Sequence, residues 1–236
     1  MTGINLKNIQ KTYVVENRKI NVLSGVNLNI PKGLITVILG RSGCGKTTLL
    51  RVAGGLEVAD KGRVEVERFH KTTFVFQEPR LMPWLNVWDN VKFGLKKQKI
   101  EIEVIQGIID TVGLNGFEKA YPNQLSGGMK QRVAIARALA YKPSVIMMDE
   151  PFAALDHFTR GQMQRELIHL QREQGVSILF VTHSIDEALF LGHKIVVLEE
   201  GRIKSEFMIE SNNEERNLLD VEFIELKKEI LEELDL

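Results

Sequence analysis

The chain has 236 residues, 44% of them hydrophobic and 26% charged, a balance typical of a globular protein with one large domain. Lysine plus arginine and aspartate plus glutamate both number 31, so the net charge favours neither a nucleic acid nor an acidic partner. The single cysteine, Cys44, excludes an internal disulfide and favours a reducing cytoplasm. No signal peptide is expected, and no apolar run approaches the roughly 18 residues that a spanning helix needs.

The first 80 residues predict strands on both sides of a glycine-rich loop. Between residues 4 and 30, apolar residues alternate with polar ones, as at Val26, Leu28 and Ile30, which is the period of a half-buried strand. Residues 34–39 are nearly all apolar, as in a buried parallel strand. A helix over 46–56 and short strands at 64–66 and 73–76 are expected to follow.

Helical periodicity replaces this pattern between residues 81 and 140, which predicts an inserted helical subdomain. Further buried strands are expected over 145–148, 178–181 and 195–198, with an amphipathic helix over 158–173. Alternating strands and helices predict an α/β fold with a mostly parallel sheet. We therefore expect a single domain over 1–236, with a core from 1–80 and 141–210, the helical subdomain over 81–140 and a terminal helix over 211–236.

The C-terminal tail, residues 210–236, holds ten acidic and three basic residues. Five apolar residues in it recur at helical spacing: Leu219, Phe223, Leu226, Ile230 and Leu234. This stripe predicts a terminal helix docked on the core, with a dimer contact or a regulatory contact as the alternative.

Residues 40–47 match the phosphate-loop pattern at every fixed position, between a predicted buried strand and a predicted helix. Glycines let backbone N–H groups converge on phosphate oxygens, and the following helix adds its positive N-terminal end. Lys46 is expected to reach the β- and γ-phosphates of ATP, and Thr47 to ligate Mg²⁺. The alternative is a glycine-rich turn without a ligand. The expected nucleotide contacts are Gly40, Arg41, Ser42, Gly43, Cys44, Gly45, Lys46, Thr47 and Thr48.

Polar side chains follow two other predicted strands. Asp149 and Glu150 come after the apolar run at 145–148, and His183 follows the run at 178–181. Ligands of open α/β sheets bind at the carboxyl ends of strands, so these groups are expected at one site. Asp149 is placed to hold Mg²⁺ through its water shell, Glu150 to polarise the attacking water, and His183 to bond the γ-phosphate or that water. The alternative for the two acids is a solvated strand end.

Residues 125–132, Leu-Ser-Gly-Gly-Met-Lys-Gln-Arg, resemble the signature motif of ABC transporter ATPases, and all motifs of that family occur in its order. The resemblance implies a P-loop NTPase fold with a RecA-like core, an N-terminal antiparallel β subdomain and the helical subdomain. It also implies roles for Tyr13 (stacking on adenine), Gln77 (a Q-loop glutamine contacting Mg²⁺ and the water), Asp156 (D-loop, with residues 154–155) and His183 (switch histidine).

In this family the signature of one subunit closes on the ATP held by the other. The resemblance therefore implies a homodimer with ATP at the interface, in which Ser126, Gly127 and Gly128 contact the partner's nucleotide. Residues 76–87 look like the nitrate/sulfonate/taurine import branch, as do the short segment between 66 and 76 and the Met after the double glycine. Trp84 and Trp88 are either core aromatics or part of a groove that receives a short helix from a membrane partner.

The leading hypothesis is thus the ATPase subunit of an importer, peripheral on the cytoplasmic face of the membrane, with separate permease chains and, indirectly, a solute-binding protein. The alternatives are a soluble ABC-type ATPase, the ATPase subunit of an exporter, and a nucleotide-binding module without turnover. The solute is open: sulfonates, nitrate, riboflavin and pyrimidine precursors are all compatible with the resemblance.

Overall fold

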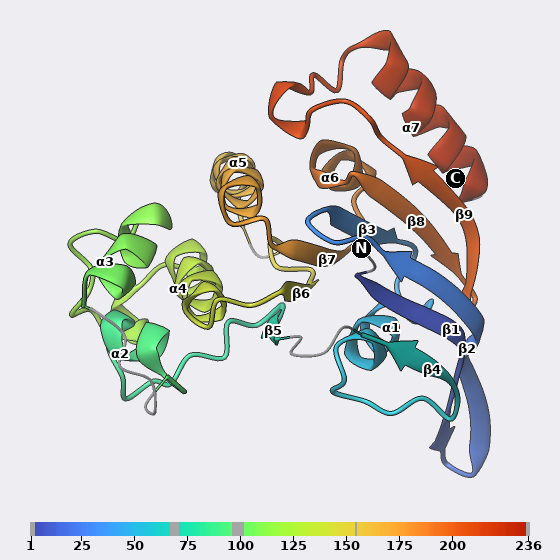
Figure 1. Cartoon of the computed structure of the whole chain (residues 1–236), viewed down its shortest axis with the longest axis horizontal. Helices are drawn as coiled ribbons and strands as arrows, with labels where there is room; N and C mark the ends of the chain where they lie inside the picture. The colour runs from blue at the N-terminus through green and yellow to red at the C-terminus, as the bar shows by residue number, and fades with distance from the viewer. Residues whose placement is uncertain (1–2, 67–70, 96–101, 154, 235–236) are drawn as a thin grey trace. The chain divides into compact units, whose positions relative to one another are not determined.

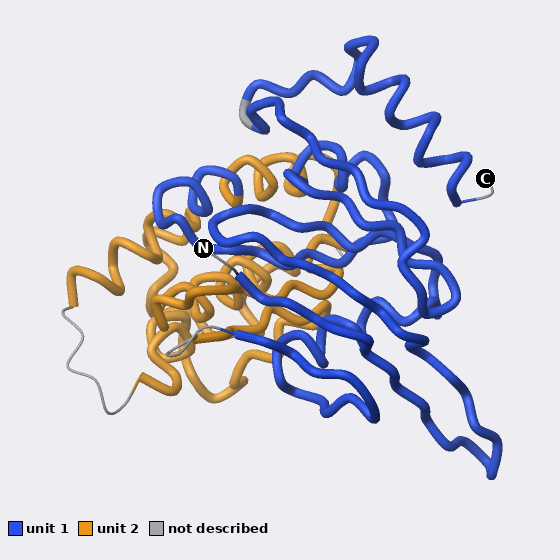
Figure 2. The backbone as a smooth tube through the Cα atoms, turned by 45° about the vertical axis from the view of Figure 1, so that its right-hand side comes forward, with its two compact units in different colours: residues 1–70, 168–236 blue, residues 71–167 orange. Residues whose placement is uncertain are grey.

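The structure is a computed structural model that describes residues 3–66, 71–95, 102–153 and 155–234, without the side chain of Glu214. The chain divides into two compact units, one formed by residues 1–70 and 168–236 and the other by residues 71–167 (Figure 2). They are called unit 1 and unit 2 below, and each is described by itself.

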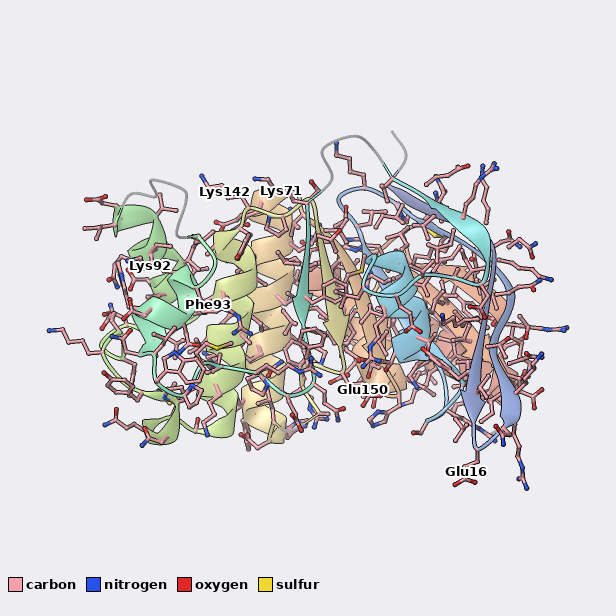
Figure 3. All side chains as sticks on the ribbon, turned by 90° about the horizontal axis from the view of Figure 1, so that it is seen from below. Glu16, Lys71, Lys92, Phe93, Lys142 and Glu150 are labelled. Atoms are coloured by element: carbon pink, nitrogen blue, oxygen red, sulfur yellow. The ribbon has the colours of Figure 1, made fainter. Side chains whose placement is uncertain are left out.

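Unit 1 begins with an antiparallel sheet in the order β2-β1-β4. Its strands are β1 (Ile4–Val15), β2 (Arg18–Ile30) and β4 (Lys61–Glu65). The alternation read from the sequence is the burial pattern here, because Val26, Leu28 and Ile30 face the core while the residues between them are exposed or half-buried. The β1–β2 turn has Glu16 at its tip (Figure 3), in a left-handed conformation with φ of 48°.

The second sheet segment of unit 1 has the order β7-β3-β8-β9. Strand β3 (Ile35–Leu39) is buried at all five positions and pairs in parallel with β7 (Ser177–Thr182) and β8 (Lys194–Glu199). Strand β9 (Arg202–Met208) adds an antiparallel edge. Helices α1 (Lys46–Ala53), α6 (Ile185–Leu191) and α7 (Val221–Glu233) and the 3₁₀ turn η2 (Asn213–Glu215) complete the unit (Figure 1).

Unit 2 pairs β5 (Thr72–Val75) with β6 (Val145–Asp149) in parallel. Its helices are α2 (Val87–Lys92), α3 (Ile102–Thr111) and α4 (Gly127–Ala140), with the 3₁₀ turn η1 (Pro122–Gln124). Helix α5 (His157–Gln174) begins in unit 2 and ends in unit 1. Fully buried Val91, Ile109 and Val133 show that each of the three helices α2, α3 and α4 contributes to the core.

The mixed α/β architecture with a parallel-stranded sheet and a separate antiparallel sheet is the one expected from the sequence. The boundaries differ in places. Helix α1 ends at Ala53 rather than 56, because Gly54 caps it and Gly55 has a φ of 74°. Strand β4 starts at Lys61, earlier than expected, and Val66 lies beyond its end and is 50% exposed. Strand β9 was not expected, because its alternate positions are only half-buried and its sequence is largely polar.

The tail forms helix α7, and Phe223, Ile230 and Leu234 are buried in unit 1. Leu219 was wrongly assigned to the apolar stripe: it precedes the helix and is 80% exposed. The Lys227 ammonium pairs with the Asp186 carboxylate of α6 at 2.5 Å, so the helix is docked on its own chain. None of the helices within the described ranges has the length and apolar character that a membrane crossing requires.

Candidate nucleotide site

The phosphate loop of unit 1 connects β3 to α1 and lies against the turn between β8 and β9. A Cβ atom on Gly40 would come within 2.4 Å of the Leu198 carbonyl oxygen, so only glycine fits there. Gly45 has a φ of 108°, and a Cβ there would approach the Val22 carbonyl oxygen to 2.7 Å. The Gly201 N–H donates to the Cys44 carbonyl at 3.1 Å, which fixes the far side of the loop. Ser42 and Gly43 are exposed at its outer edge.

Lys46 is only 5% exposed, and its ammonium donates to the carbonyl oxygens of Gly40 at 2.7 Å and Arg41 at 2.8 Å. The ammonium is therefore held inside the loop rather than in solvent. Thr47 is half-buried and Thr48 buried, on the first turn of α1. Burial raises the pKa of the Cys44 thiol, which keeps it protonated and favours a packing role over a reactive one.

Tyr13 lies beside the same loop within unit 1. Its hydroxyl donates to Glu57 Oε1 at 2.5 Å and also bonds the Thr48 side chain, and the Lys11 ammonium lies 5.6 Å from its ring centroid. Partial burial, followed by the Glu57 hydrogen bond, raises the pKa of Tyr13. The ring is thus tied by its hydroxyl to the helix that begins at Lys46.

His183 follows β7 and is exposed. In the parallel pairing of β3 with β7, Thr182 lies opposite Leu39. Gly40 and His183 are the next residues of the two strands, so they follow this pair at the same end of the sheet. The Thr182 hydroxyl donates to Glu187 Oε2 at 2.5 Å and accepts from the Ser184 N–H at 3.0 Å, and Ser184 caps α6. The histidine therefore leaves the sheet at the edge that carries the phosphate loop, held by bonds on both neighbours.

Gln77, Asp149 and Glu150 have a similar relationship in unit 2. Val75 pairs with Met148 in the parallel β5–β6 ladder, so Gln77 and Glu150 each lie two positions beyond that pair. Asp149 and Glu150 are half-buried, and Glu150 has a left-handed φ of 43°. Such a conformation is uncommon for a residue with a Cβ and is often found at functional sites. Figure 3 shows Glu150 at the opposite end of the β5–β6 pair from Lys71 and Lys142, which lie just before these strands.

The signature residues form the N-terminus of α4. The Ser126 hydroxyl caps the helix by accepting from the Met129 N–H at 3.3 Å. Gly127 is exposed with open space above it, whereas a Cβ on Gly128 would lie 3.1 Å from Thr159 and 3.4 Å from Leu155. The double glycine thus leaves free backbone N–H groups at a positive helix end, which is where anions bind.

Asp156 caps α5 by accepting from the N–H groups of Phe158 at 3.1 Å and Thr159 at 3.0 Å. Hydrogen bonds from the side chain and the backbone of Thr159 are the main cause of the lowered pKa of Asp156. This residue has a structural task in the subunit in addition to its expected D-loop role. Ala154 of that motif, and residues 67–70 of the segment before the Q-loop, lie outside the described residues.

Two polar side chains of α4 that had no predicted role hold the Q-loop region. Gln131 is 2% exposed, and its amide donates to the Phe76 carbonyl at 3.3 Å. The Arg137 guanidinium donates to the carbonyls of Pro79 at 2.8 Å and Arg80 at 2.9 Å, and burial lowers the pKa of Arg137. Both lie on α4, so the signature helix is bonded to both flanks of Gln77. A polar residue spaced along an apolar helix was the signal available in the sequence.

The segment after the Q-loop is ordered by one residue. Asn90 is fully buried and exchanges four hydrogen bonds with the backbone of Met82, Leu85 and Asn86. Trp84, between these residues, is 69% exposed, so the core interpretation is wrong for it; Trp88 is half-buried. Of the other histidines, His193 accepts from the Ile35 N–H through Nδ1, and His157 and His169 lie at the surface.

The residues fit a nucleoside triphosphate with a divalent cation. Gly43, at the exposed edge of the loop, has open space where a Cβ would lie, and the Lys46 ammonium lies inside the same loop, bonded to the Gly40 carbonyl. Among the described residues, no cluster of three His, Cys, Asp or Glu side chains could hold a metal alone. Mg²⁺ commonly takes only one or two protein ligands and completes its shell with phosphates and water. That the unit 1 and unit 2 residues act on one nucleotide stays a prediction.

Comparisons with known proteins agree with this chemistry. The family model described as ABC transporter matches residues 23–153. An uncharacterized ABC transporter ATP-binding protein of Methanocaldococcus jannaschii is 42% identical, over 97% of this chain and 90% of its own length. The aliphatic sulfonates import ATP-binding protein SsuB of Bacillus cereus is 38% identical, over 98% of this chain and 96% of its own.

Among solved structures, the dimeric post-hydrolysis state of the ATP-binding cassette MJ0796 with ADP and Pi superimposes with a TM-score of 0.80. It is 35% identical, and the match covers 88% of this chain and 99% of that one. Family match, full-length relatives and fold all point the same way: this chain belongs to the ABC transporter ATP-binding family and is an ATPase of the ABC type.

Proposed function

We propose that this chain is the ATP-hydrolysing subunit of an importer and that it powers uptake of a sulfonate-class solute through separate membrane permease chains. The observation that carries the proposal is the 38% identity to an aliphatic sulfonates import ATP-binding protein along almost the whole length of both chains. The subunit itself binds at the cytoplasmic face of the membrane, and a solute-binding protein delivers the solute on the other side.

In this proposal the nucleotide is held mainly by unit 1. Tyr13 stacks on the adenine, backbone N–H groups of residues 40–48 surround the phosphates, and Lys46 moves from the loop carbonyls to the β- and γ-phosphates. Thr47, Gln77 and Asp149 supply ligands for Mg²⁺, directly or through water. When bound, Mg²⁺ neutralises charge on the transferred phosphoryl group.

Hydrolysis requires a polarised water and a compensated transition-state charge. We assign Glu150 to accept the proton of the attacking water, with Gln77 orienting that water and His183 bonding the γ-phosphate. Lys46 and the N-terminal end of α4 from a second subunit, at Ser126, Gly127 and Gly128, stabilise the charge that develops. The active form is thus a homodimer with ATP at its interface. The dimeric state of the MJ0796 cassette, which holds ADP and Pi, supports this proposal.

The permease contact is assigned to the segment from Gln77 to Asn90. Its backbone is fixed by Asn90 while the Trp84 ring is 69% exposed, which suits a rigid surface that presents one aromatic anchor. This segment begins at the Q-loop, so movement of a docked helix and movement of Gln77 would be coupled. The division into a core, a helical subdomain over 81–140 and a terminal helix over 211–236 is part of the same proposal.

Growth on a sulfonate tests the transport function. In the native organism, deletion of the gene should abolish growth with an alkanesulfonate as sole sulfur source and leave growth on sulfate unchanged. The parent gene should restore it and the Glu150→Gln gene should not. Normal growth of the deletion strain on several sulfonates, with loss of uptake of another solute class, would reject the sulfonate assignment and keep the ATPase. Recovery of the protein in a complex without a permease would reject the importer.

A further inference from the structure

Arg41, in the phosphate loop, is bonded to the far end of the chain. Its guanidinium Nη2 donates to the carbonyl oxygen of Leu234 at 2.7 Å, across 193 positions of sequence. Leu234 is the C-terminal cap of α7 and is 4% exposed. The last carbonyls of a helix have no partner within it and carry its negative end, so a guanidinium is a favourable partner there.

Helix α7 is itself anchored, so this bond ties the loop to a fixed point. Arg216, before the helix, donates to the carbonyls of Leu189 at 2.8 Å and Gly192 at 2.7 Å at the end of α6. Lys227 pairs with Asp186 at the start of α6. Phe223 and Ile230 are buried in the unit. Figure 1 shows α7 in red beside α6, as the last helix of the chain.

The backbone of Arg41 is engaged on its other side by the residue that binds phosphate. Its carbonyl accepts from the Lys46 ammonium at 2.8 Å and from the Cys44 N–H at 3.3 Å. Arg41 is therefore held by its side chain on α7 and by its carbonyl on Lys46. The bond to α7 does not depend on the proposed move of Lys46 to the phosphates. The opposite side of the loop is held by the bond from Gly201 to Cys44. A loop fixed at both sides loses less conformational freedom when it closes around phosphates, which raises affinity.

We propose that α7 is a positioning element of the nucleotide site: the Leu234 carbonyl holds Arg41, and this link preorganises the phosphate loop and strengthens nucleotide binding. The inference rests on the proposed nucleotide site but assigns a new task to the tail. Arg41 then acts through the loop and not by direct contact of its guanidinium with ATP.

Two truncations separate this role from others. Deletion of 235–236 keeps a Leu234 oxygen as acceptor, whereas deletion of 231–236 removes it and leaves Lys227, Phe223 and Ile230 in place. The probes are ADP–Mg²⁺ by calorimetry and ATP by steady-state hydrolysis. The longer deletion should raise the Kd for ADP and the KM for ATP by about threefold to tenfold, the value of one partly exposed charged hydrogen bond, with kcat within twofold. The shorter deletion should match the parent.

Substitution of Arg41 completes the cycle. Arg41→Ala should raise the Kd for ADP as much as the 231–236 deletion does, and Arg41→Lys should raise it less. Arg41→Ala combined with the 231–236 deletion should have the same Kd as either change alone. Weaker binding in Arg41→Ala with normal binding in the 231–236 deletion would mean direct contact with the nucleotide and would overturn the proposal. Additive losses would overturn it as well.

A third variant covers a deletion that fails to fold. Lys227→Glu places a negative charge against Asp186 and should loosen α7, which raises the Kd for ADP; Lys227→Glu with Asp186→Lys should restore it. Unchanged affinity in Lys227→Glu, in a protein whose α7 amides exchange faster with solvent, would also contradict the link. A parent protein that fails to bind ADP would reject the proposed nucleotide site instead.

Discussion

The Gln131 amide donates to the Phe76 carbonyl, which joins the signature helix α4 to the residue directly before Gln77. Gln131 is 2% exposed, so its side chain is largely shielded from water. The motif that is expected to bind the partner's ATP and the glutamine that is expected to sense the local ATP are therefore connected within unit 2. Arg137, six residues further along α4, makes the equivalent connection to Pro79 and Arg80.

Gln131→Leu should test this connection. The change keeps the apolar packing and leaves the Phe76 carbonyl without its side-chain donor, so the free energy of unfolding should fall by about 1–3 kcal/mol. ATPase activity should fall severalfold, because Gln77 is no longer fixed relative to α4. The control is Glu103→Gln, an exposed change on α3. Parent activity in a folded Gln131→Leu protein would show that Gln131 does not position Gln77.

Substitution of Glu150 by glycine should separate the effect of this residue on hydrolysis from its effect on stability. With a φ of 43°, the residue costs backbone energy that glycine would relieve. Glu150→Gly should abolish hydrolysis while leaving the free energy of unfolding unchanged or raised by up to about 1 kcal/mol. Glu200 is the matched control, because it is exposed and has a φ of 44°. Glu200→Gly should have the same effect on stability and keep hydrolysis; hydrolysis at the parent rate in Glu150→Gly would make the assigned base wrong.

His193 predicts a pH dependence of stability. Burial, and then the nearby Arg216 charge, lower the pKa of His193 below its ordinary 6.5. The unfolded chain therefore takes up this proton before the folded one, and the stabilisation is complete above about pH 6.5 and is lost as the pH falls toward the folded pKa. Chemical denaturation between pH 7.5 and 5 should show this loss. His193→Asn keeps an acceptor for the Ile35 N–H and should remove that part of the slope; an unchanged slope would assign it to other groups.

Trp84 should affect the permease and not the isolated enzyme. Trp84→Ala removes a ring that is 69% exposed, so ATPase activity and stability of the free subunit should match the parent. Co-purification with the permease chains should fall about tenfold or more, as expected for a buried aromatic anchor. Val58→Ala, 82% exposed in unit 1, is the control. Equal recovery of both variants with the permease would place the contact elsewhere.

Much of the site was predictable because its motifs are local. Residues 40–47 dictate their own backbone through glycines, and an apolar strand followed by Asp149 and Glu150 defines its own end. The antiparallel edge strand β9 was not predictable, because its sequence is largely polar and none of its residues is fully buried, so the segment resembles a loop. The sequence did not decide whether Trp84 lies in the core or at the surface, because a single sequence does not show which residues pack against an aromatic side chain.

Contacts between segments that are distant in the sequence could not be predicted either. Nothing in the sequence relates Arg41 to Leu234, or Gln131 to Phe76, because each pair depends on how helices pack after the chain has folded. Leu219 was predicted to be buried and is not. Its spacing fits the apolar stripe of the tail, but the helix starts at Val221, and Leu219 is 80% exposed. Periodicity identifies a helix more reliably than it identifies where the helix begins.

In the proposed homodimer, the signature residues of one chain complete the nucleotide site of the other. Light scattering of the Glu150→Gln protein with saturating ATP–Mg²⁺ measures whether this dimer forms, because ATP is bound and not consumed. We predict a particle of twice the 26.8 kDa chain mass with ATP, a monomer without it, and a monomer for Glu150→Gln combined with Ser126→Arg. A Glu150→Gln protein that binds ATP with parent affinity and stays monomeric at all protein concentrations would contradict the proposed homodimer.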